Sequence, residues 1–435
     1  MVYYGYYPMV ALGYTFAMFS DQVRPGIIAT LLLLIVAAQI LATLFLRKDY
    51  VLAGETPDIS LMARIRYRLF FTGRPAVGTI DMLVALYFIY NLLSGIWCHL
   101  YGMPVSVWQG EFCTSILTMV FYIVGRKLMD SERDSFYNSF LIAVCFLGGL
   151  GLLLFIWGPQ FYLDYLLKID LISKADVPTM RVRMHSVVGS IQLGYLSVAG
   201  MLAAVHIMMR NKGRKGKALL FICMLFAFLS NQRSAMVVAV LVLLFVNYLL
   251  FYTYKLLPLK LLAIEVGVLG GGFILMCVIF MRAVMKVYYR LVSLPGAIGQ
   301  RSDQWIGAIN NMSNLWLGNG LGANGHRANG INPHMIADGG LAKLFVEMGI
   351  IGTAVFAYMM ILCFRYGVKH LKECSAELGI IAVTLLQSIG SNILEFQVLT
   401  PIFWFAVGVI AAAAVKYRKP EEDPGPKKKG DGKAS

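Results

Sequence analysis

The hydrophobic pattern of this chain consists of long apolar runs separated by short polar segments. The runs are about twenty residues long, the length that an α-helix needs to cross a hydrocarbon core of about 30 Å. They predict helices at 4–20, 26–46, 76–97, 107–125, 138–157, 187–209, 217–231, 235–254, 261–281, 349–365, 377–394 and 400–415. The pattern therefore predicts an all-α, polytopic integral membrane protein with about twelve transmembrane helices.

Composition supports a membrane protein and excludes an ordinary soluble domain. Of the 435 residues, 59% are hydrophobic and only 14% are charged, whereas soluble domains carry roughly a quarter of charged residues. The seven cysteines lie mostly inside apolar runs without CxxC spacing, so neither a disulfide framework nor a zinc site is predicted. We interpret the first apolar run as a span, because no basic segment or cleavage site marks it as a signal peptide.

The distribution of basic residues predicts the topology. An even number of spans places both termini on one side, and with cytoplasmic termini 26 of the 38 Lys and Arg residues fall on the inside. The net charge of +15 is thus explained by membrane orientation rather than by nucleic-acid binding. We divide the chain into a transmembrane domain at 1–415 and a disordered basic cytoplasmic tail at 416–435, whose lysines contact anionic lipid.

Two long outer segments, at 158–186 and 282–348, break the positive-inside trend. They hold 10 of the 12 basic residues that remain on the outside. We predict that these segments pack over one cavity, because a cationic outer surface at the membrane's edge suits an anionic substrate.

Arginines are the main candidates for binding in these outer regions. Arg181 and Arg183 precede the sixth predicted helix, Arg233 lies in the tight turn between helices seven and eight, and Arg301 lies in the second segment. Guanidinium groups present paired donors suited to phosphate or pyrophosphate oxygens. Each arginine alone could equally bind a lipid headgroup or cap a helix, although the tight turn holds Arg233 against the bundle.

The segment GNGLGANG at 318–325 contains a GxGxxG pattern at Gly320, Gly322 and Gly325. A dinucleotide fingerprint needs a strand before the pattern and a helix after it, and neither is predicted here. We therefore expect a tight loop, forming a flexible rim of the cavity, whose backbone N–H groups face a ligand. Trp305 nearby is expected either to stack on a sugar ring or to anchor the membrane interface.

His334 and Asp338 are the candidates for a general base. A helix is predicted to run from His334 into the tenth span, which would place both side chains on one face at i and i+4. Stabilisation of the helix start is the alternative role for both. The outer aspartates are scattered singly and no Walker A sequence occurs, so neither a metal ion nor a nucleotide cofactor is predicted.

Several motifs together resemble those of the Wzy-type O-antigen polymerases and the related O-antigen ligases. The glycine loop is followed by DGGLAKLFVEMGIIG at 338–352, in which Glu347 and the G-I-I-G turn occupy family-like places. Arg183 stands in RMHSVVGSIQLG, Arg233 ends an S-x-x-R turn, and Arg301 precedes Trp305. The order of these motifs along the chain carries the resemblance.

This resemblance implies a GT-C-like fold and a metal-independent glycosyltransferase of the bacterial inner membrane. Such an enzyme polymerises undecaprenyl-diphosphate-linked repeat units at the outer face, in contact with membrane lipids and a chain-length regulator protein. The implied catalytic residues are His334, Asp338 and Arg301; the implied pyrophosphate ligands are Arg181, Arg183, Arg233 and Arg301; the implied glycan contacts are Gly320, Gly322 and Trp305.

Two alternatives to a polymerase stay open. Ligases of the superfamily carry a histidine eleven residues before the G-I-I-G turn and transfer glycan to lipid A core, whereas this chain has Asp338 at that place. The Asp therefore favours a polymerase. A transporter of lipid-linked oligosaccharide or of small anions is the other alternative, because intramembrane charges such as Asp81 also suit transport.

Overall fold

The computed structural model describes residues 2–20, 22–45, 78–127, 130–158, 160–168, 183–211, 214–255, 285, 288–289, 292 and 294–416. All regular secondary structure in these ranges is helical. Seven helical segments are long and apolar enough to cross a membrane. The chain is therefore a multi-pass, all-helical membrane protein.

Helices are found at eleven of the twelve predicted ranges, and the other range, 261–281, lies outside the described residues. The α-helices are α1 (Val2–Phe19), α2 (Pro25–Phe45), α4 (Thr79–Leu100), α5 (Val105–Glu111), α6 (Val120–Lys127), α7 (Asp130–Trp157), α8 (Gln160–Lys168), α9 (Ser190–Asn211), α10 (Arg214–Leu229), α11 (Arg233–Tyr248), α14 (Leu294–Asn310), α15 (Gly340–Lys369), α16 (Leu371–Ser388) and α17 (Thr400–Lys416). Two short 3-10 helices, His326–Ala328 and Ile393–Glu395, lie near the sites described below.

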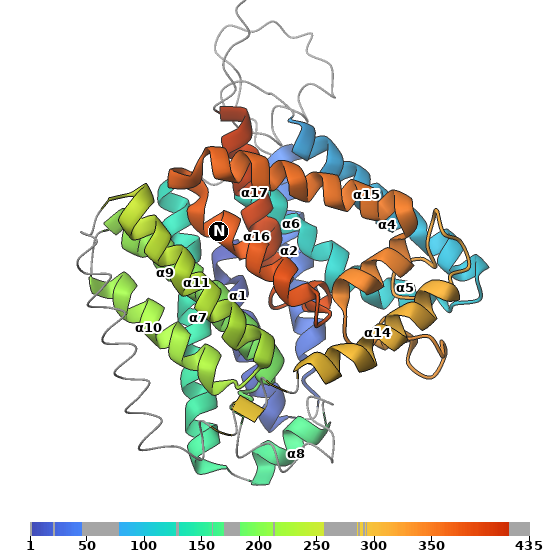
Figure 1. Cartoon of the computed structure of the whole chain (residues 1–435), viewed down its shortest axis with the longest axis horizontal. Helices are drawn as coiled ribbons and strands as arrows, with labels where there is room; N and C mark the ends of the chain where they lie inside the picture. Colours follow the sequence, from blue (N-terminus) through green and yellow to red (C-terminus); the bar gives the residue numbers. More distant parts are fainter. Residues whose placement is uncertain are drawn as a thin grey trace, which may run out of the picture.

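Helix α9 is almost wholly buried and packs against α7, α10, α11 and α16 (Figure 1). Glycines allow its close approach to α10, since a Cβ on Gly200 would lie 2.9 Å from the sulfur of Cys223. The same device joins α6 to α17, where a Cβ on Gly125 would lie 2.1 Å from the carbonyl oxygen of Phe405. In lipid, where the hydrophobic effect does not drive helices together, these small residues allow the close van der Waals packing that does.

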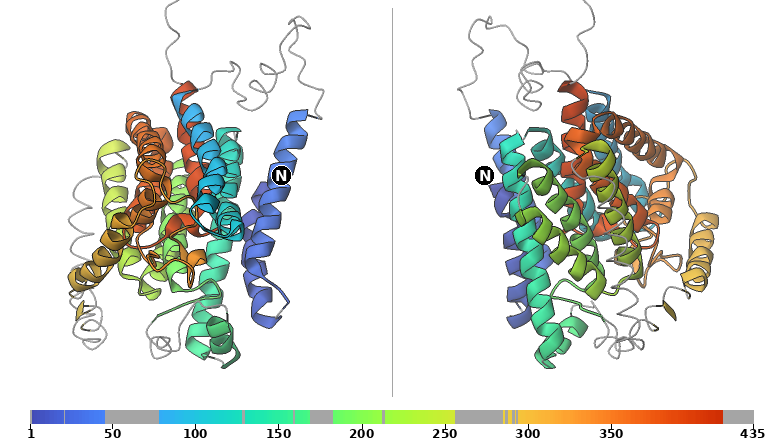
Figure 2. Two further views of the ribbon diagram at one scale, coloured as in Figure 1. Left: turned by 90° about the vertical axis from the view of Figure 1, so that its right-hand side faces the viewer. Right: turned by 60° about the vertical axis from the view of Figure 1, so that its left-hand side comes forward.

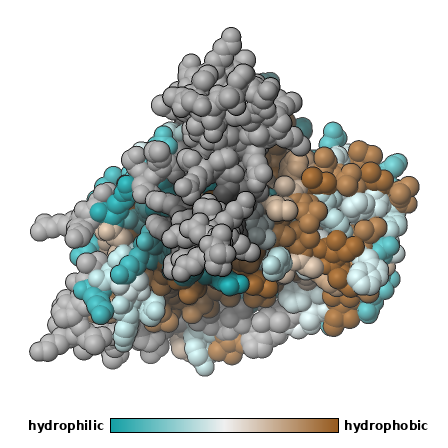
Figure 3. Space-filling view, turned by 90° about the horizontal axis from the view of Figure 1, so that it is seen from above, coloured by the Kyte–Doolittle hydropathy of each residue, from teal (hydrophilic) through white to brown (hydrophobic). Residues whose placement is uncertain are grey.

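The outer surface of the bundle is apolar. Helices α1 and α2 pack together along one flank (Figure 2), and α2 exposes large hydrophobic side chains such as Leu31 and Leu41. Further exposed hydrophobic residues occur on α4, α7 and α11, and Figure 3 shows such areas on the flanks of the described surface. A lipid environment accounts for this exposure, which would be costly in water.

Helix α15 is broken at Gly349, which has φ 61° and ψ −167°, a conformation open only to glycine. The break leaves backbone groups without helical partners on both sides, and residues 315–320, which include the start of the glycine segment, pair with them. The hydrogen bonds run from Asn319 N–H to Val346 C=O (2.9 Å), from Gly320 N–H to Glu347 C=O (2.9 Å), from Ile350 N–H to Leu315 C=O (3.0 Å) and from Ile351 N–H to Trp316 C=O (3.2 Å). The loop thereby supplies hydrogen-bond partners to the N–H and C=O groups beside Gly349, which lipid could not do.

The predicted helix start at His334 is wrong, because residues 331–339 are not helical and α15 begins at Gly340. Asparagine side chains hold this stretch in a loop: the Asn332 carboxamide accepts the His334 N–H (2.8 Å), and the Asn324 carboxamide donates to the His334 carbonyl (2.9 Å). His334 and Asp338 therefore do not share a helical face.

Replacing Gly349 tests the importance of the break. We expect Gly349→Ala to lower the free energy of unfolding by about 2–4 kcal/mol, because its Cβ would lie 2.4 Å from the Gly318 nitrogen and the conformation is strained. Gly149→Ala in α7 is the matched control, since nothing lies within 4 Å of its Cβ. SDS-induced unfolding in mixed micelles measures both, and equal stability of the two variants would contradict this role of Gly349.

Candidate active site

The segment that carries Arg183 is held by contacts to α10 and α8. The N–H of Met184 donates to the carbonyl of Leu229 at the end of α10 (3.0 Å). Tyr162 of α8 donates its hydroxyl to the Ser186 carbonyl (2.9 Å), and Ser186 itself has φ 56°, unusual for a residue other than glycine. These contacts fix the backbone next to Arg183. Strained residues such as Ser186 are often found at functional sites, so this segment is a candidate for one.

The turn that carries Arg233 lies directly beside this segment. It connects α10 to α11 through Ser230 and Asn231, and Asn231 also has a positive φ, of 48°. A Cβ on Gly194 of α9 would lie 2.8 Å from the Ser230 hydroxyl, so α9 packs tightly under the turn. The turn therefore holds the start of α11, and with it Arg233, in a fixed place.

Arg301 and Trp305 lie one turn apart on α14, and both contact Asp338. The Arg301 guanidinium pairs with the Asp338 carboxylate at 2.8 Å, and the Trp305 indole N–H donates to the Asp338 carbonyl at 2.7 Å. Gly339, with φ 132°, follows Asp338, and a Cβ there would lie 2.3 Å from the indole nitrogen. Only glycine allows this approach of the loop to α14.

These three regions line one cavity of about 460 Å³, which we call the arginine cavity. Its lining residues are Arg183, Ile191, Gln232, Arg233, Ser234, Arg301, Trp305, Asp338, Leu386, Ile389 and Gly390. Three arginines and one aspartate are thus among the described lining residues, which makes the cavity cationic. Ile191, Leu386 and Ile389 give one part of the lining an apolar character. The combination suits a ligand with an anionic head and an apolar chain.

The structure thus brings together Arg183, Arg233, Arg301, Trp305 and Asp338, as predicted for two outer segments packed over one cavity. Arg181 lies outside the described residues. The backbone around His334 is bonded to asparagine side chains, and His334 is not among the residues that line the cavity.

The glycine loop has a different place from the one expected. Gly320 and Gly322 are buried: a Cβ on Gly320 would lie 2.5 Å from the Cys98 Cβ of α4, and one on Gly322 would lie 2.9 Å from the Glu111 Cβ of α5. The Gly320 N–H faces α15 rather than a ligand. The loop is therefore part of the packed support of the outer region, not a rim of the arginine cavity.

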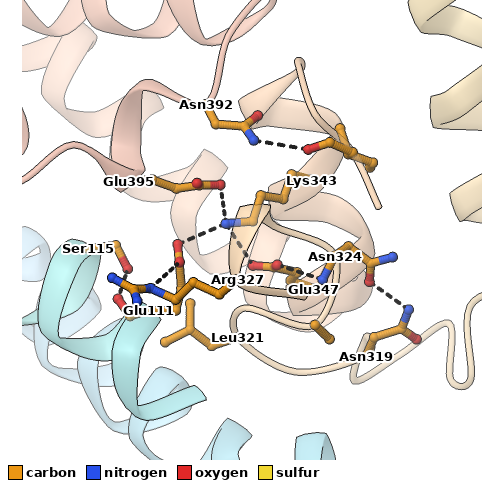
Figure 4. Close-up of polar contacts among 12 residues, drawn as sticks. Glu111, Ser115, Asn319, Leu321, Asn324, Arg327, Lys343, Glu347, Asn392 and Glu395 are labelled. Atoms are coloured by element: carbon orange, nitrogen blue, oxygen red, sulfur yellow. Dashed lines mark hydrogen bonds and ion pairs between the residues drawn. The ribbon is translucent and has the colours of Figure 1, made fainter. Parts of the chain in front are cut away.

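A buried cluster of charged residues, missed in the sequence, lies beside the glycine loop (Figure 4). The Lys343 ammonium lies 2.8 Å from a Glu111 carboxylate oxygen, 3.5 Å from one of Glu347, and also contacts Glu395. The Glu347 carboxylate accepts the N–H of Asn324 at 3.0 Å, which ties the cluster to the loop. We call Glu111, Lys343, Glu347 and Glu395 the lysine cluster.

The sequence did contain a signal for the lysine cluster. Glu111 is a carboxylate inside a predicted span, and Lys343 and Glu347 are spaced i and i+4. Which charges meet could not be inferred, because Glu111 and Lys343 are 232 positions apart.

Three carboxylates around one ammonium leave an excess of negative charge in the lysine cluster. Arg327, 3.7 Å from Glu111 and partly exposed, offsets a part of it. Burial raises the pKa of the Glu395 carboxyl to about 8, and the neighbouring carboxylates of Glu111 and Glu347 add to this effect, while Lys343 opposes it. Glu395 therefore keeps its proton to a higher pH than an ordinary carboxyl group, which limits the buried excess charge.

The lysine cluster lines a second cavity, of about 50 Å³, on the other side of two paired chain segments. The two segments are 338–340 and 390–392. Asp338 and Gly390 line the arginine cavity, whereas Gly340 and Asn392 line the second cavity. The Gly340 N–H donates to the Ser391 carbonyl (3.2 Å) between them. The cluster thus supports the wall of the arginine cavity from behind.

Asp81, the buried charge that would suit a transporter, is paired within the bundle. Asp81 forms a buried ion pair with Arg126 at 3.0 Å and accepts a hydrogen bond from Tyr122, which ties α4 to α6. Within the described ranges, no group of three or more His, Cys, Asp or Glu side chains is arranged to hold a metal ion. That the protein needs no metal stays a prediction.

Comparisons with known proteins identify no family. No protein-family model matches the chain, and no curated protein matches it. The function must therefore be argued from the arginine cavity itself.

The raised pKa of Glu395 predicts a pH-dependent stability. Its stabilising contribution is fully present below about 4.5, the ordinary pKa, and is lost as the pH rises through about 8. We expect the melting temperature in detergent to fall between pH 5 and 9, and Glu395→Gln to reduce this fall because the amide stays neutral. Glu373→Gln, at an exposed site on α16, is the control and should keep the wild-type slope. An unchanged slope in Glu395→Gln would contradict the buried, protonated carboxyl.

Proposed function

We propose that the protein is a membrane glycosyltransferase that polymerises undecaprenyl-diphosphate-linked polysaccharide repeat units. The observation that carries the proposal is the convergence of Arg183, Arg233 and Arg301, from three separate segments, in one cavity with an apolar side. Three guanidinium groups match the charge and the oxygen geometry of a diphosphate. The apolar side matches the first part of a polyprenyl chain.

The arginines would act mainly by electrostatic stabilisation. When the bond between the anomeric carbon and the phosphate oxygen breaks, its electron pair goes to the diphosphate, and fixed guanidinium groups stabilise the charge that develops. The acceptor hydroxyl oxygen forms the new bond to the anomeric carbon and loses its proton to a base. Binding donor and acceptor in one cavity also supplies proximity.

Asp338 is the base that the geometry favours over His334. Its carboxylate lines the arginine cavity, whereas His334 is not among the lining residues. In this proposal Asp338 accepts the proton of the acceptor hydroxyl. Trp305, also in the lining, would stack on a sugar of the repeat unit.

The proposal includes a location in the bacterial inner membrane. In the proposed topology the chain has twelve spans in a GT-C-like arrangement, and both termini are cytoplasmic. The loops at 158–186 and 282–348 lie on the outer side, and the basic tail at 416–435 lies in the cytoplasm. The arginine cavity then opens toward the outer face, where lipid-linked repeat units are joined. Membrane lipids and a chain-length regulator protein would be its partners, without metal, cofactor or nucleic acid.

Incubating the purified protein with the lipid-linked repeat unit alone tests the proposal. A ladder of lengthening products, unchanged by EDTA, is expected. Transfer that requires added lipid A core would show a ligase instead, and loss of activity with EDTA would contradict the metal-free reaction. Movement of the intact lipid-linked oligosaccharide or of anions across a vesicle membrane, without a new glycosidic bond, would show a transporter.

Removal of one arginine should lower the rate strongly. We expect Arg233→Gln to reduce the initial rate by about 10²-fold, because one fixed donor to the developing charge is lost. Arg24→Gln, an exposed arginine in the turn between α1 and α2, is the matched control and should keep wild-type activity. Equal rates for the two variants would remove Arg233 from the site.

The two candidate bases can be separated by substitution. We expect Asp338→Asn to lower the rate by about 10²-fold or more, since proton transfer to a positioned base contributes 10²–10⁴-fold. His334→Ala should retain most activity. The reverse order, measured as initial rates on folded, monodisperse protein, would assign the base to His334.

A further inference from the structure

Asp338 occupies a particular position in the arginine cavity. Among the described residues that line the cavity it is the one acidic residue, and its carboxylate oxygen lies 2.8 Å from the Arg301 guanidinium. The side chains of Arg301 and Asp338 are 31% and 38% exposed, so both reach the cavity space. We propose that Asp338 holds the place on Arg301 that a substrate phosphate takes, and that the diphosphate displaces it on binding. This rests on the proposed function in taking a diphosphate as the ligand.

The backbone of this loop is fixed while the carboxylate is not. The Asp338 carbonyl accepts the Trp305 indole N–H at 2.7 Å, and the Gly340 N–H donates to Ser391 at 3.2 Å. Gly339 between them has no room for a side chain. Displacement therefore needs only rotation of the Asp338 side chain about its Cα–Cβ bond, and the loop stays in place.

The competition for Arg301 favours the diphosphate. A partly exposed carboxylate paired with one arginine is held weakly, because solvent screens the pair. A diphosphate carries more charge and reaches Arg183 and Arg233 in the same cavity, so it gains several charge-assisted hydrogen bonds at once. Bound diphosphate would then take the Arg301 donors and leave the carboxylate free beside the substrate.

The exchange links donor binding to catalysis. Before the donor binds, the Asp338 carboxylate is engaged by Arg301 and its charge lowers the mutual repulsion of the three arginines. After the donor binds, the carboxylate is available to accept the proton of the acceptor hydroxyl. Asp338 thus becomes a base only when the bond to be broken is in place.

Binding of inorganic pyrophosphate to the full-length protein in detergent, measured by titration calorimetry, tests this exchange. We expect Asp338→Asn to bind pyrophosphate roughly two- to five-fold more tightly than wild type, since the competing carboxylate is gone. Asp303→Asn is the matched control, because Asp303 is an exposed carboxylate two residues from Arg301 on α14. It removes the same charge and should leave the affinity unchanged. In an Arg301→Gln background, Asp338→Asn should have no further effect.

Each outcome separates this inference from the proposed function. Affinity that is unchanged or weaker in Asp338→Asn, or equally tightened in Asp303→Asn, would overturn the exchange and leave the diphosphate site standing. Absence of pyrophosphate binding to wild type would overturn both. Tighter binding by Asp338→Asn without any glycan transfer by wild type would support the exchange and contradict the polymerase.

Discussion

The break in α15 at Gly349 is the constraint on which the outer part of the molecule depends. An interrupted helix leaves backbone groups without helical partners, and the chain at 315–320 pairs with those on both sides of Gly349. This pairing anchors a long segment that has little regular structure of its own. Because residues 311–339 contain just one short 3-10 helix, their position follows from such contacts and from the asparagine side chains within them. The place of Asp338 opposite Arg301 is therefore a consequence of how the loop meets the broken helix.

Buried charge reinforces the same arrangement. The lysine cluster joins α5, α15, the glycine loop and the segment before α17. Apolar contacts between helices would allow several arrangements of these four regions, whereas the ion pairs require one. Breaking such a cluster by removing Lys343 would leave three buried carboxyl groups without their central cation. The glycine loop lies against this cluster and against α4, and its glycines are needed because a side chain at Gly320 or Gly322 would clash with Cys98 or Glu111. The arginine cavity lies on the other side of the two paired chain segments, which are joined by the hydrogen bond from Gly340 to Ser391.

Much of the fold could be predicted because hydrophobicity in a membrane protein is a local property. Every predicted span in the described ranges corresponds to a helix. Arg183, Arg233 and Arg301 line one cavity, as was predicted from their departure from the positive-inside pattern. The start of α15 could not be predicted, because the hydrogen bonds of Asn324 and Asn332 compete with helix formation around His334. The lysine cluster was missed for a related reason: its members are distant in sequence, and Glu395 lies in the turn between α16 and α17, which hydropathy does not position.

The central claim is that the arginine cavity binds the diphosphate of a lipid-linked glycan. A cryo-EM structure of the protein in lipid nanodiscs with a polyprenyl-diphosphate-linked saccharide tests it most directly. The account predicts diphosphate density between Arg183, Arg233 and Arg301, with the prenyl chain leaving past Leu386 and Ile389. Density for the diphosphate at another surface, or a cavity that opens to the cytoplasmic side, would contradict it.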